Sequence, residues 1–399
     1  MTPAPAAAAT DSDVETLLRT RVDALVREHG VDAPDLLGAR YDAGLAFVHH
    51  PEGLGGLGVP ATHQARLEEL LVAAGVPAPA PYRNPLGTGT AVPTLLAHGS
   101  RELQERHFRA AWTAEEIWCQ LFSEPGAGSD LAGLATRAVL DGDTWVVNGQ
   151  KVWTSYAHRA RWGLLLARTD PELPKHQGMT MFVVDMHHPG VEVRPLRQAT
   201  GGQEFNEVFF TDVEIPDSAR LDRRGSGWAV ARTTLLHERS ALGARPAPRE
   251  DGHIGWLADL WRERPDLRTP QLHARVVDAW IRAEAVRLTN ERIRQLAASG
   301  RPGLEGSAAK VQHAETTQLI ARVRAELDPE AALRYDEWDP DLAPPREERV
   351  AGYHYLRSRP MSIEGGATQI LLSQIADRVL GLPREPALPK ETPWSEIPR

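Results

Sequence analysis

Strand-length runs of β-forming residues fill one continuous block of this 399-residue chain, residues 117–216. Within "TRAVLDGDTWVVNGQKVWTS", Asp141-Gly142 and Asn148-Gly149 are strong signals for tight hairpin turns. "WGLLLAR", "MTMFVVDM", "GVEVRPL" and "NEVFFTDVEIP" follow, and no helical pattern separates them. The block therefore predicts about seven strands that pair antiparallel in a barrel or sandwich.

Helical spacing occupies both sides of this block. "VETLLRTRVDALVREHG" precedes it, and "WAVARTTLLHERSALG" follows it, each with apolar residues on one face. We therefore expect an α+β chain in five parts. These are a disordered lead (1–12), an N-terminal helical domain (13–116), a middle β-domain (117–222), a C-terminal helical region (223–385) and a tail (386–399).

The end of the helical region carries two further signals. "DPEAALRYDEWDPDLAPPREE", from residue 328, is acidic and proline-rich, and predicts an excursion too long for a plain connection. "QILLSQIADRVLG" predicts a last helix that Thr368 caps and that Gly381 ends. Its apolar face is expected to comprise Ile370, Leu371, Ile375 and Val379.

Composition excludes several classes of function. A net charge of -9 argues against nucleic acid as the main partner, because phosphate binding needs a basic face. Cys119 is the only cysteine, so neither an intramolecular disulfide nor a cysteine metal cluster can form, which suits a cytoplasmic protein. His49 and His50 lack ligand spacing, and no metal site is expected. No window approaches the roughly 20 apolar residues of a membrane span, and the N-terminus lacks the pattern of a signal peptide.

Two loops have a composition that suits ligand binding. In "SEPGAGSD", Gly126 and Gly128 allow close backbone approach, and backbone N–H groups there could hold an anion; a plain strand-exit turn is the alternative. Ser129 and Asp130 could cap a following helical turn. In "NGQKVWTS", Trp153 offers a flat surface to a planar heterocycle, although the residues alone favour a tryptophan buried in the β-layer.

Two carboxylates are candidates for proton transfer. Glu238 and Arg239 interrupt an otherwise apolar helix, where charges are either paired or functional. Glu364 precedes Gly365 and Gly366 in "SIEGGATQI". No arrangement of serine, histidine and aspartate for nucleophilic catalysis can be assembled.

Taken together, "CQLFSEPGAGSDLAG", "NGQKVWTS", "FNEVFFTDVEIP", "ERSALG" and "GGATQILLSQIADRVLGLP" resemble the acyl-CoA dehydrogenase family over about residues 40–385. The resemblance implies a C-terminal four-helix bundle and FAD bound without a Rossmann fingerprint. It also implies α,β-dehydrogenation of an acyl-CoA or acyl-pantetheine thioester, an electron-transfer flavoprotein or similar acceptor, and a homodimer, tetramer or hetero-oligomer. The implied FAD contacts are Phe122, Ser123, Gly128, Ser129, Trp153, Thr154, Ser155 and Gln369.

The resemblance offers two places for the base that removes the α-proton. When the last loop is aligned on "QI", the position of the base in the loop falls on Gly365, so Glu364 lies one residue too early. In an extended segment, a shift of one residue points the side chain in the opposite direction. The isovaleryl-type placement falls on Glu238, which we prefer over Glu364. Gly365 would then offer its N–H to the thioester oxygen, and Arg239 would shape the electrostatics.

Two family motifs that hold the adenosine half of FAD are missing. "RERPDLRTPQLHARV" lacks the Phe-Gly of R-x-x-F-G, and "AELDPEAALRYDEWD" replaces a glycine-rich stretch. Arg262, Arg264 or Arg275 could compensate. Two rival functions follow: a non-catalytic or half-active subunit of a hetero-oligomer, and a flavin oxidase or monooxygenase on the same fold.

Overall fold

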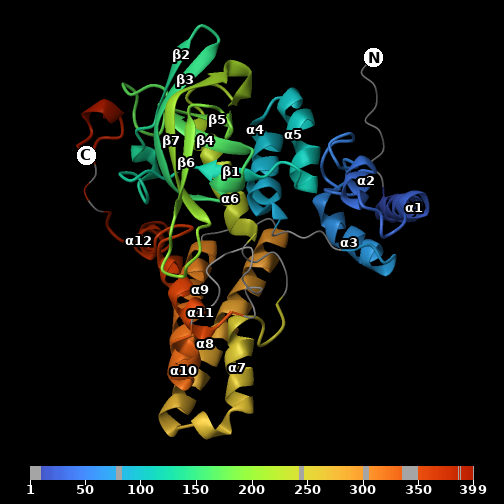
Figure 1. The fold of residues 1–399 in the computed structure, drawn as a ribbon, viewed down its shortest axis with the longest axis vertical. Coiled ribbons are helices and arrows are strands. Elements are labelled where there is room, and N and C mark those ends of the chain that lie inside the picture. Colours follow the sequence, from blue (N-terminus) through green and yellow to red (C-terminus); the bar gives the residue numbers. More distant parts are fainter. Residues whose placement is uncertain are drawn as a thin grey trace.

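The computed structural model describes residues 10–77, 83–241, 247–299, 305–334, 349–384, 386 and 388–398. The N-terminal and C-terminal parts of the chain are helical, and the part between them in sequence forms a single sheet (Figure 1). This arrangement confirms the predicted α+β class. The N-terminal helices are α1 (Asp11–His29), α2 (Leu36–Asp42), α3 (Gln64–Ala73), α4 (Val92–His98) and α5 (Arg101–Thr113), with a π-helical turn at Gly87–Ala91 before α4.

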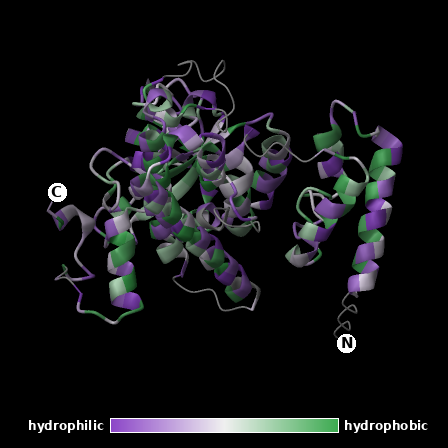
Figure 2. Ribbon diagram, turned by 90° about the horizontal axis from the view of Figure 1, so that it is seen from below, coloured by the Kyte–Doolittle hydropathy of each residue, from purple (hydrophilic) through white to green (hydrophobic). Residues whose placement is uncertain are grey.

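Helix α1 begins earlier than the sequence predicted. Thr10 forms a capping box with Asp13, which satisfies backbone N–H groups that the first turn leaves unpaired. Residues 10–12 are therefore ordered, and the rest of the predicted disordered lead lies outside the described residues. The hydrophobic and hydrophilic residues of α1 alternate along the helix (Figure 2). The buried residues, Val14, Leu18, Val22 and Leu25, belong to one core cluster with α2 and α3.

The middle of the chain forms one eight-stranded sheet with the path β6-β7-β3-β2-β4-β5-β8. Its strands are β1 (Trp118–Leu121), β2 (Arg137–Asp141), β3 (Thr144–Ser155), β4 (Trp162–Arg168), β5 (Met179–Asp185), β6 (Val191–Leu196), β7 (Phe205–Pro216) and β8 (Arg220–Leu221). The pairing is mostly antiparallel, as predicted. However, β1 lies off this path and pairs with β4 in parallel, with Trp118 opposite Trp162. The long 122–161 excursion allows this, because a parallel pair needs a crossover.

One predicted hairpin turn is confirmed and the other is wrong. Asp141 ends β2, and Gly142 and Asp143 form the turn into β3; Gly142 has a left-handed backbone (φ 62°). Asn148-Gly149 instead lies within β3, at an irregularity in its pairing with β7. A side chain at Gly149 would collide with Thr136, 2.5 Å away, so the glycine serves close packing rather than a turn.

The C-terminal helices fall into two groups. Helix α6 (Gly227–Ala241) packs on α4 and β5, while the others pack around α9 (Figure 1). The others are α7 (His253–Glu263), α8 (Pro270–Ala298), α9 (Glu305–Leu327), α10 (Pro329–Ala332), α11 (Ala351–Ser358) and α12 (Thr368–Arg378). The helical C-terminal region is confirmed. Most of the predicted proline-rich excursion, residues 335–348, lies outside the described residues.

The predicted apolar face of α12 is only partly buried. Leu371 is 4% exposed, whereas Ile370 and Val379 are 41% and 58% exposed. Thr368 does not cap the helix: it is the first helical residue, and Ala367 stands at the cap position without a side-chain bond. Gly381 adopts the left-handed conformation (φ 65°) predicted for the end of the helix.

Two buried histidines predict a loss of stability in mild acid. Burial lowers the pKa of both His50 and His107 from 6.5 to about 4. As the pH falls from about 6.5 to about 4, the unfolded chain therefore takes up protons before the folded chain does. This difference costs about 3 kcal/mol of unfolding free energy per histidine. Urea unfolding at several pH values should show the loss, and His107→Phe should remove part of it. An unchanged pH dependence in His107→Phe would contradict this account.

Candidate active site

The glycine-rich loop leaves β1 directly beside the end of β3. The carbonyl of Ser123 accepts a hydrogen bond from Val152 N (2.9 Å), and the carbonyl of Phe122 accepts one from Lys151 Nζ (2.9 Å). The Phe122 side chain is buried in the core. Any contact between Phe122 and a ligand would therefore be made from the core side of the loop. Gly128 and Ser129 are exposed, with open space around the glycine. Residues from the two predicted ligand loops thus lie side by side.

A buried ion pair holds these loops together. Lys151 Nζ lies 2.8 Å from Glu124 Oε1, and the side chains are 0% and 8% exposed. Glu124 also accepts from Ala135 N (2.6 Å) and Thr136 N (2.9 Å). Burial lowers the pKa of Lys151 to about 8. Burial alone would raise the pKa of Glu124, but Lys151 and the backbone donors together lower it, so both groups are charged at pH 7.

Trp153 is not the core tryptophan that the residues alone favoured. Its side chain is 62% exposed, and its backbone is left-handed (φ 60°) where the β3–β7 register shifts between Lys151 and Thr154. An irregularity of this kind turns a side chain away from its normal face, and a bulky residue with positive φ is found where the surroundings enforce it. The indole is thus presented to solvent, with one edge against Phe205.

The hydroxyls beside Trp153 differ in environment. Thr154 is buried, and its Oγ1 has no hydrogen-bond partner within the part of the chain that the structure describes. Ser155 is half-buried at the strand end. An unsatisfied buried hydroxyl is uncommon in folded proteins.

Asp130 does not act as the predicted cap. The short 3-10 turn Leu131–Gly133 follows it without a side-chain cap, and both Asp130 carboxylate oxygens lie 2.8 Å from Lys175 Nζ. Ser129 is exposed and does not cap the turn either. The loop is therefore held from outside by side chains of the β4–β5 connection.

The C-terminal loop is a turn, not the extended segment assumed for the register argument. Gly365 and Gly366 both have positive φ (63° and 106°). Glu364 forms an ion pair with Arg357 (3.1 and 3.2 Å), and Lys310 Nζ donates to Gly366 O (2.5 Å). The direction of Glu364 is thus set by Arg357 rather than by strand alternation.

Glu364 and the end of β3 belong to the same electrostatic neighbourhood. Burial and the nearby Glu204 raise the pKa of Tyr156, which follows Ser155, while Arg357 opposes this shift. The Tyr156 backbone N–H also donates to Glu204 O (2.7 Å). Burial would lower the pKa of Arg357, but the nearby carboxylates of Glu364 and Glu204 raise it. The loop with Gly365 therefore lies near the strand end that carries Trp153.

Glu238 is placed by a different set of contacts. It lies half-buried near the end of α6, four residues beyond Thr234, whose hydroxyl bonds Thr94 on α4 (2.9 Å). The Arg239 side chain lies outside the described part of the chain. Gln369 is exposed in the first turn of α12.

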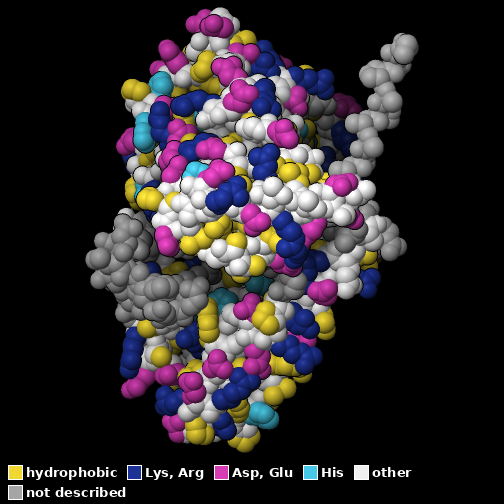
Figure 3. Space-filling model, turned by 90° about the vertical axis from the view of Figure 1, so that its right-hand side faces the viewer, with side chains coloured by type: hydrophobic (Ala, Val, Ile, Leu, Met, Phe, Trp, Pro, Cys, Tyr) yellow, Lys and Arg dark blue, Asp and Glu magenta, His cyan; other side chains and the backbone are white. Residues whose placement is uncertain are grey.

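The arginines considered for the adenosine half of FAD already have acidic neighbours. Arg262 pairs with Glu250 (2.6 Å), Arg264 with Asp266 (2.8 Å), and Arg275 with Glu326. The face in Figure 3 likewise mixes basic and acidic side chains without a large patch of one sign. No arginine of this set is therefore singled out as an anion ligand.

Several supporting residues were not predicted. Glu124 and Lys151 were present in the quoted motifs without a role, although a lysine in a β-rich run was a possible signal. Tyr156 carried no local signal, since its place beside Glu204 and Arg357 depends on contacts across the fold.

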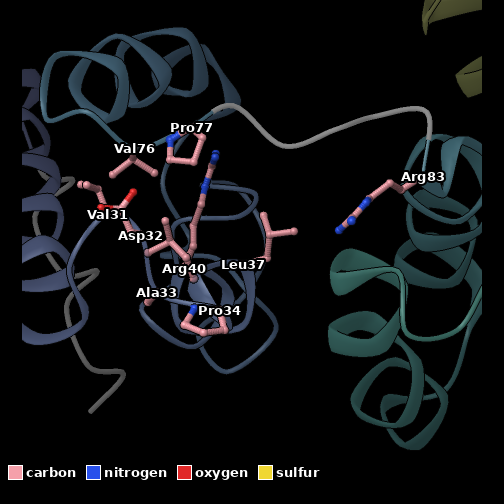
Figure 4. A pocket seen from close by; sticks show the side chains of 10 residues that line it. Val31, Asp32, Ala33, Pro34, Leu37, Arg40, Val76, Pro77 and Arg83 are labelled. Atoms are coloured by element: carbon pink, nitrogen blue, oxygen red, sulfur yellow. The ribbon is translucent and has the colours of Figure 1, made fainter. Parts of the chain in front are cut away.

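A separate cavity of about 380 Å³ lies among the N-terminal helices (Figure 4). Its lining includes Leu37, Arg40, Pro77 and Arg83, and contains none of the predicted site residues. Arg40 is buried and bonds Leu45 O (2.8 Å) and Glu68 (2.5 Å). Among the described residues, no helix is long and apolar enough to cross a membrane, and no group of three acidic, histidine or cysteine side chains could hold a metal.

Comparison with known proteins identifies the family. Residues 119–213 match the acyl-CoA dehydrogenase middle domain, and residues 225–380 match the acyl-CoA dehydrogenase C-terminal domain. The acyl-CoA dehydrogenase IpdE1 of Mycobacterium tuberculosis is 36% identical over 350 residues, which cover 86% of each chain. The chain belongs to the acyl-CoA dehydrogenase family. FadE34 of the same organism is 41% identical over 348 residues, which are 86% of this chain. The match covers only 45% of the length of FadE34.

Solved structures of the acyl-CoA dehydrogenase family have the same fold. The Tcur3481-Tcur3483 steroid ACAD matches with a TM-score of 0.70 and 27% identity, covering 94% of this chain and 98% of that one. The ChsE4-ChsE5 complex from Mycobacterium tuberculosis matches with a TM-score of 0.68 and 25% identity, covering 95% and 100%. Both comparisons support the order of helical, β and helical regions.

Proposed function

We propose that this chain is a FAD-dependent dehydrogenase that forms a double bond between the α and β carbons of an acyl thioester, carried by coenzyme A or by an acyl-carrier protein. The observation that carries the proposal is the outward-facing Trp153 ring, held in a left-handed backbone beside the glycine-rich loop. In a chain of this family, such a surface suits a planar flavin.

The residues present fit FAD. The exposed indole of Trp153, the half-buried Ser155 hydroxyl and the open loop at Gly128 supply a flat face, a polar contact and room for a pyrophosphate. The proposed set is Phe122, Ser123, Gly128, Ser129, Trp153, Thr154, Ser155 and Gln369. When bound, FAD would accept the hydride from the β carbon.

We assign proton removal to Glu238 and thioester binding to the backbone of Gly365. A carboxylate base must be partly desolvated, and Glu238 is half-buried on α6. Glu364 is a weaker candidate because Arg357 occupies both of its oxygens. The Gly365 N–H would donate to the thioester oxygen as charge develops there, and Arg239 would adjust the local field.

Substrate and partners are proposed from the solved relatives and from one exposed surface. Because one relative is described as a steroid ACAD, we propose a bulky, steroid-derived acyl group. The exposed apolar residues of α12 suit a contact with a second subunit, identical or different, and the ChsE4-ChsE5 complex supplies a precedent. An electron-transfer flavoprotein or similar acceptor would reoxidise the flavin.

The proposal is tested with the purified chain, alone and co-expressed with candidate partner chains. We expect a yellow protein that removes two hydrogens from a thioester only when an electron acceptor is present, as followed by mass spectrometry. Faster turnover of a steroid-side-chain thioester than of a linear one would support the substrate class. A colourless protein in every preparation would favour the non-catalytic subunit, and acceptor-independent oxygen consumption would favour the oxidase.

A further inference from the structure

The C-terminal segment is docked against the middle domain. It runs from α12 along the side of the sheet (Figure 1). Trp394 N and Ser395 N donate to the carbonyls of Leu173 and Pro171, each at 3.0 Å, in the connection between β4 and β5. Pro393 forms a β-bridge with Pro174. These backbone bonds fix the segment's register.

Trp394 is the side chain that this docking buries. It is 8% exposed, its ring lies 4.7 Å from the Arg168 guanidinium, and its indole N–H donates to Gly133 O (3.3 Å). Arg168 itself is 2% exposed and donates to Ala132 O (2.6 Å) and Lys175 O (2.7 Å). A cation stacked on tryptophan away from water is a strong contact.

These contacts all converge on the end of the glycine-rich loop. The carbonyls of Ala132 and Gly133 are held by Arg168 and Trp394, and the Asp130 carboxylate is held by Lys175. Carbonyl oxygens repel an anion, whereas N–H groups attract it. Holding the carbonyls toward the C-terminal segment therefore keeps them from turning toward a pyrophosphate.

We propose that residues 388–398 form a strap that fixes the glycine-rich loop and the 3-10 turn after it, together residues 126–134, in the shape that binds the FAD pyrophosphate. Trp394 is the positioning residue of this strap and acts through Arg168. The inference rests on the proposed function, since it names FAD as the ligand of the loop.

The β4–β5 connection, on which the strap lies, also contacts the start of the helix that carries Glu238. Asp170 of this connection forms an ion pair with Arg224, just before α6. The ring of His176 makes an edge-to-face contact with Trp228 in the first turn of α6, with 4.7 Å between the ring centroids. The β4–β5 connection therefore joins the strap to both the cofactor loop and α6.

The test compares Trp394→Ala with Trp394→Phe and with Glu391→Ala, an exposed site in the same segment. We expect the dissociation constant for FAD to rise about tenfold in Trp394→Ala, as loss of one buried cation–π contact predicts, and to recover largely in Trp394→Phe. Glu391→Ala should match the wild type. At saturating FAD, the KM for the thioester should be unchanged in all variants.

Hydrogen exchange on the flavin-free protein supplies the second readout. Amides of residues 130–136 should exchange faster in Trp394→Ala than in Glu391→Ala, while those of α9 should not change. Equal FAD affinity and equal exchange in the two variants would overturn the strap. If the wild type binds no FAD, the proposed function fails, and the strap's role in cofactor binding fails with it.

Discussion

Replacing Glu238 by glutamine should lower kcat about a thousandfold while leaving flavin binding intact. The amide has nearly the same shape as the carboxylate but cannot accept the α-proton, and a positioned general base contributes about 10²–10⁴-fold. The variant is measured by steady-state turnover of an acyl thioester with an external electron acceptor. Flavin content, read from absorbance, shows that the cofactor site is undisturbed.

Glu364→Gln is the matched control for this result. Glu364 is held by Arg357, so its amide should lower kcat by only about threefold, through small shifts of the loop. A thousandfold loss in Glu364→Gln with full activity in Glu238→Gln would reverse the assignment of the base.

The second large effect is expected at the buried ion pair. Lys151→Met removes the ammonium and leaves the Glu124 carboxylate buried without its cation, which should cost about 3–5 kcal/mol of unfolding free energy. FAD should also be lost on purification, because Glu124 holds the amides of Ala135 and Thr136 at the end of the loop. Urea unfolding of the flavin-free protein measures the first effect.

A matched control uses the other lysine that holds this loop. The side chains of Lys175 and Asp130 are 30% and 63% exposed, so water screens this ion pair and Lys175→Met should cost only about 0–1 kcal/mol. The double variant Glu124→Gln, Lys151→Met should recover part of the loss, because no unpaired charge remains. Equal stability of Lys151→Met and Lys175→Met would contradict the role given to the buried pair.

The β-domain was predictable because its signals are local. Alternating strands and the Asp141-Gly142 turn depend on neighbouring residues alone. The turn predicted at Asn148-Gly149 was wrong because the glycine is needed for close packing against Thr136. That contact is tertiary, and no local sequence pattern indicates it. The parallel pairing of β1 likewise depends on where a distant strand lies.

The sequence singled out candidate site residues but could not give their geometry. Trp153 was singled out, but its outward direction depends on a register irregularity opposite β7. Strand alternation at Glu364 would require an extended backbone, whereas two glycines with positive φ form a turn there. Trp394 could not be linked to the loop at all, since 261 residues separate it from Gly133.

The most direct test of the proposed dehydrogenation is the anaerobic reaction of the flavin-loaded chain with an acyl thioester, in the wild type and in Glu238→Gln. The account predicts that the wild-type flavin loses its yellow colour in a single turnover and that the enoyl thioester appears in equal amount. Glu238→Gln should keep its colour on the same timescale. A flavin that stays oxidised in the wild type, or one that bleaches equally fast in Glu238→Gln, would contradict it.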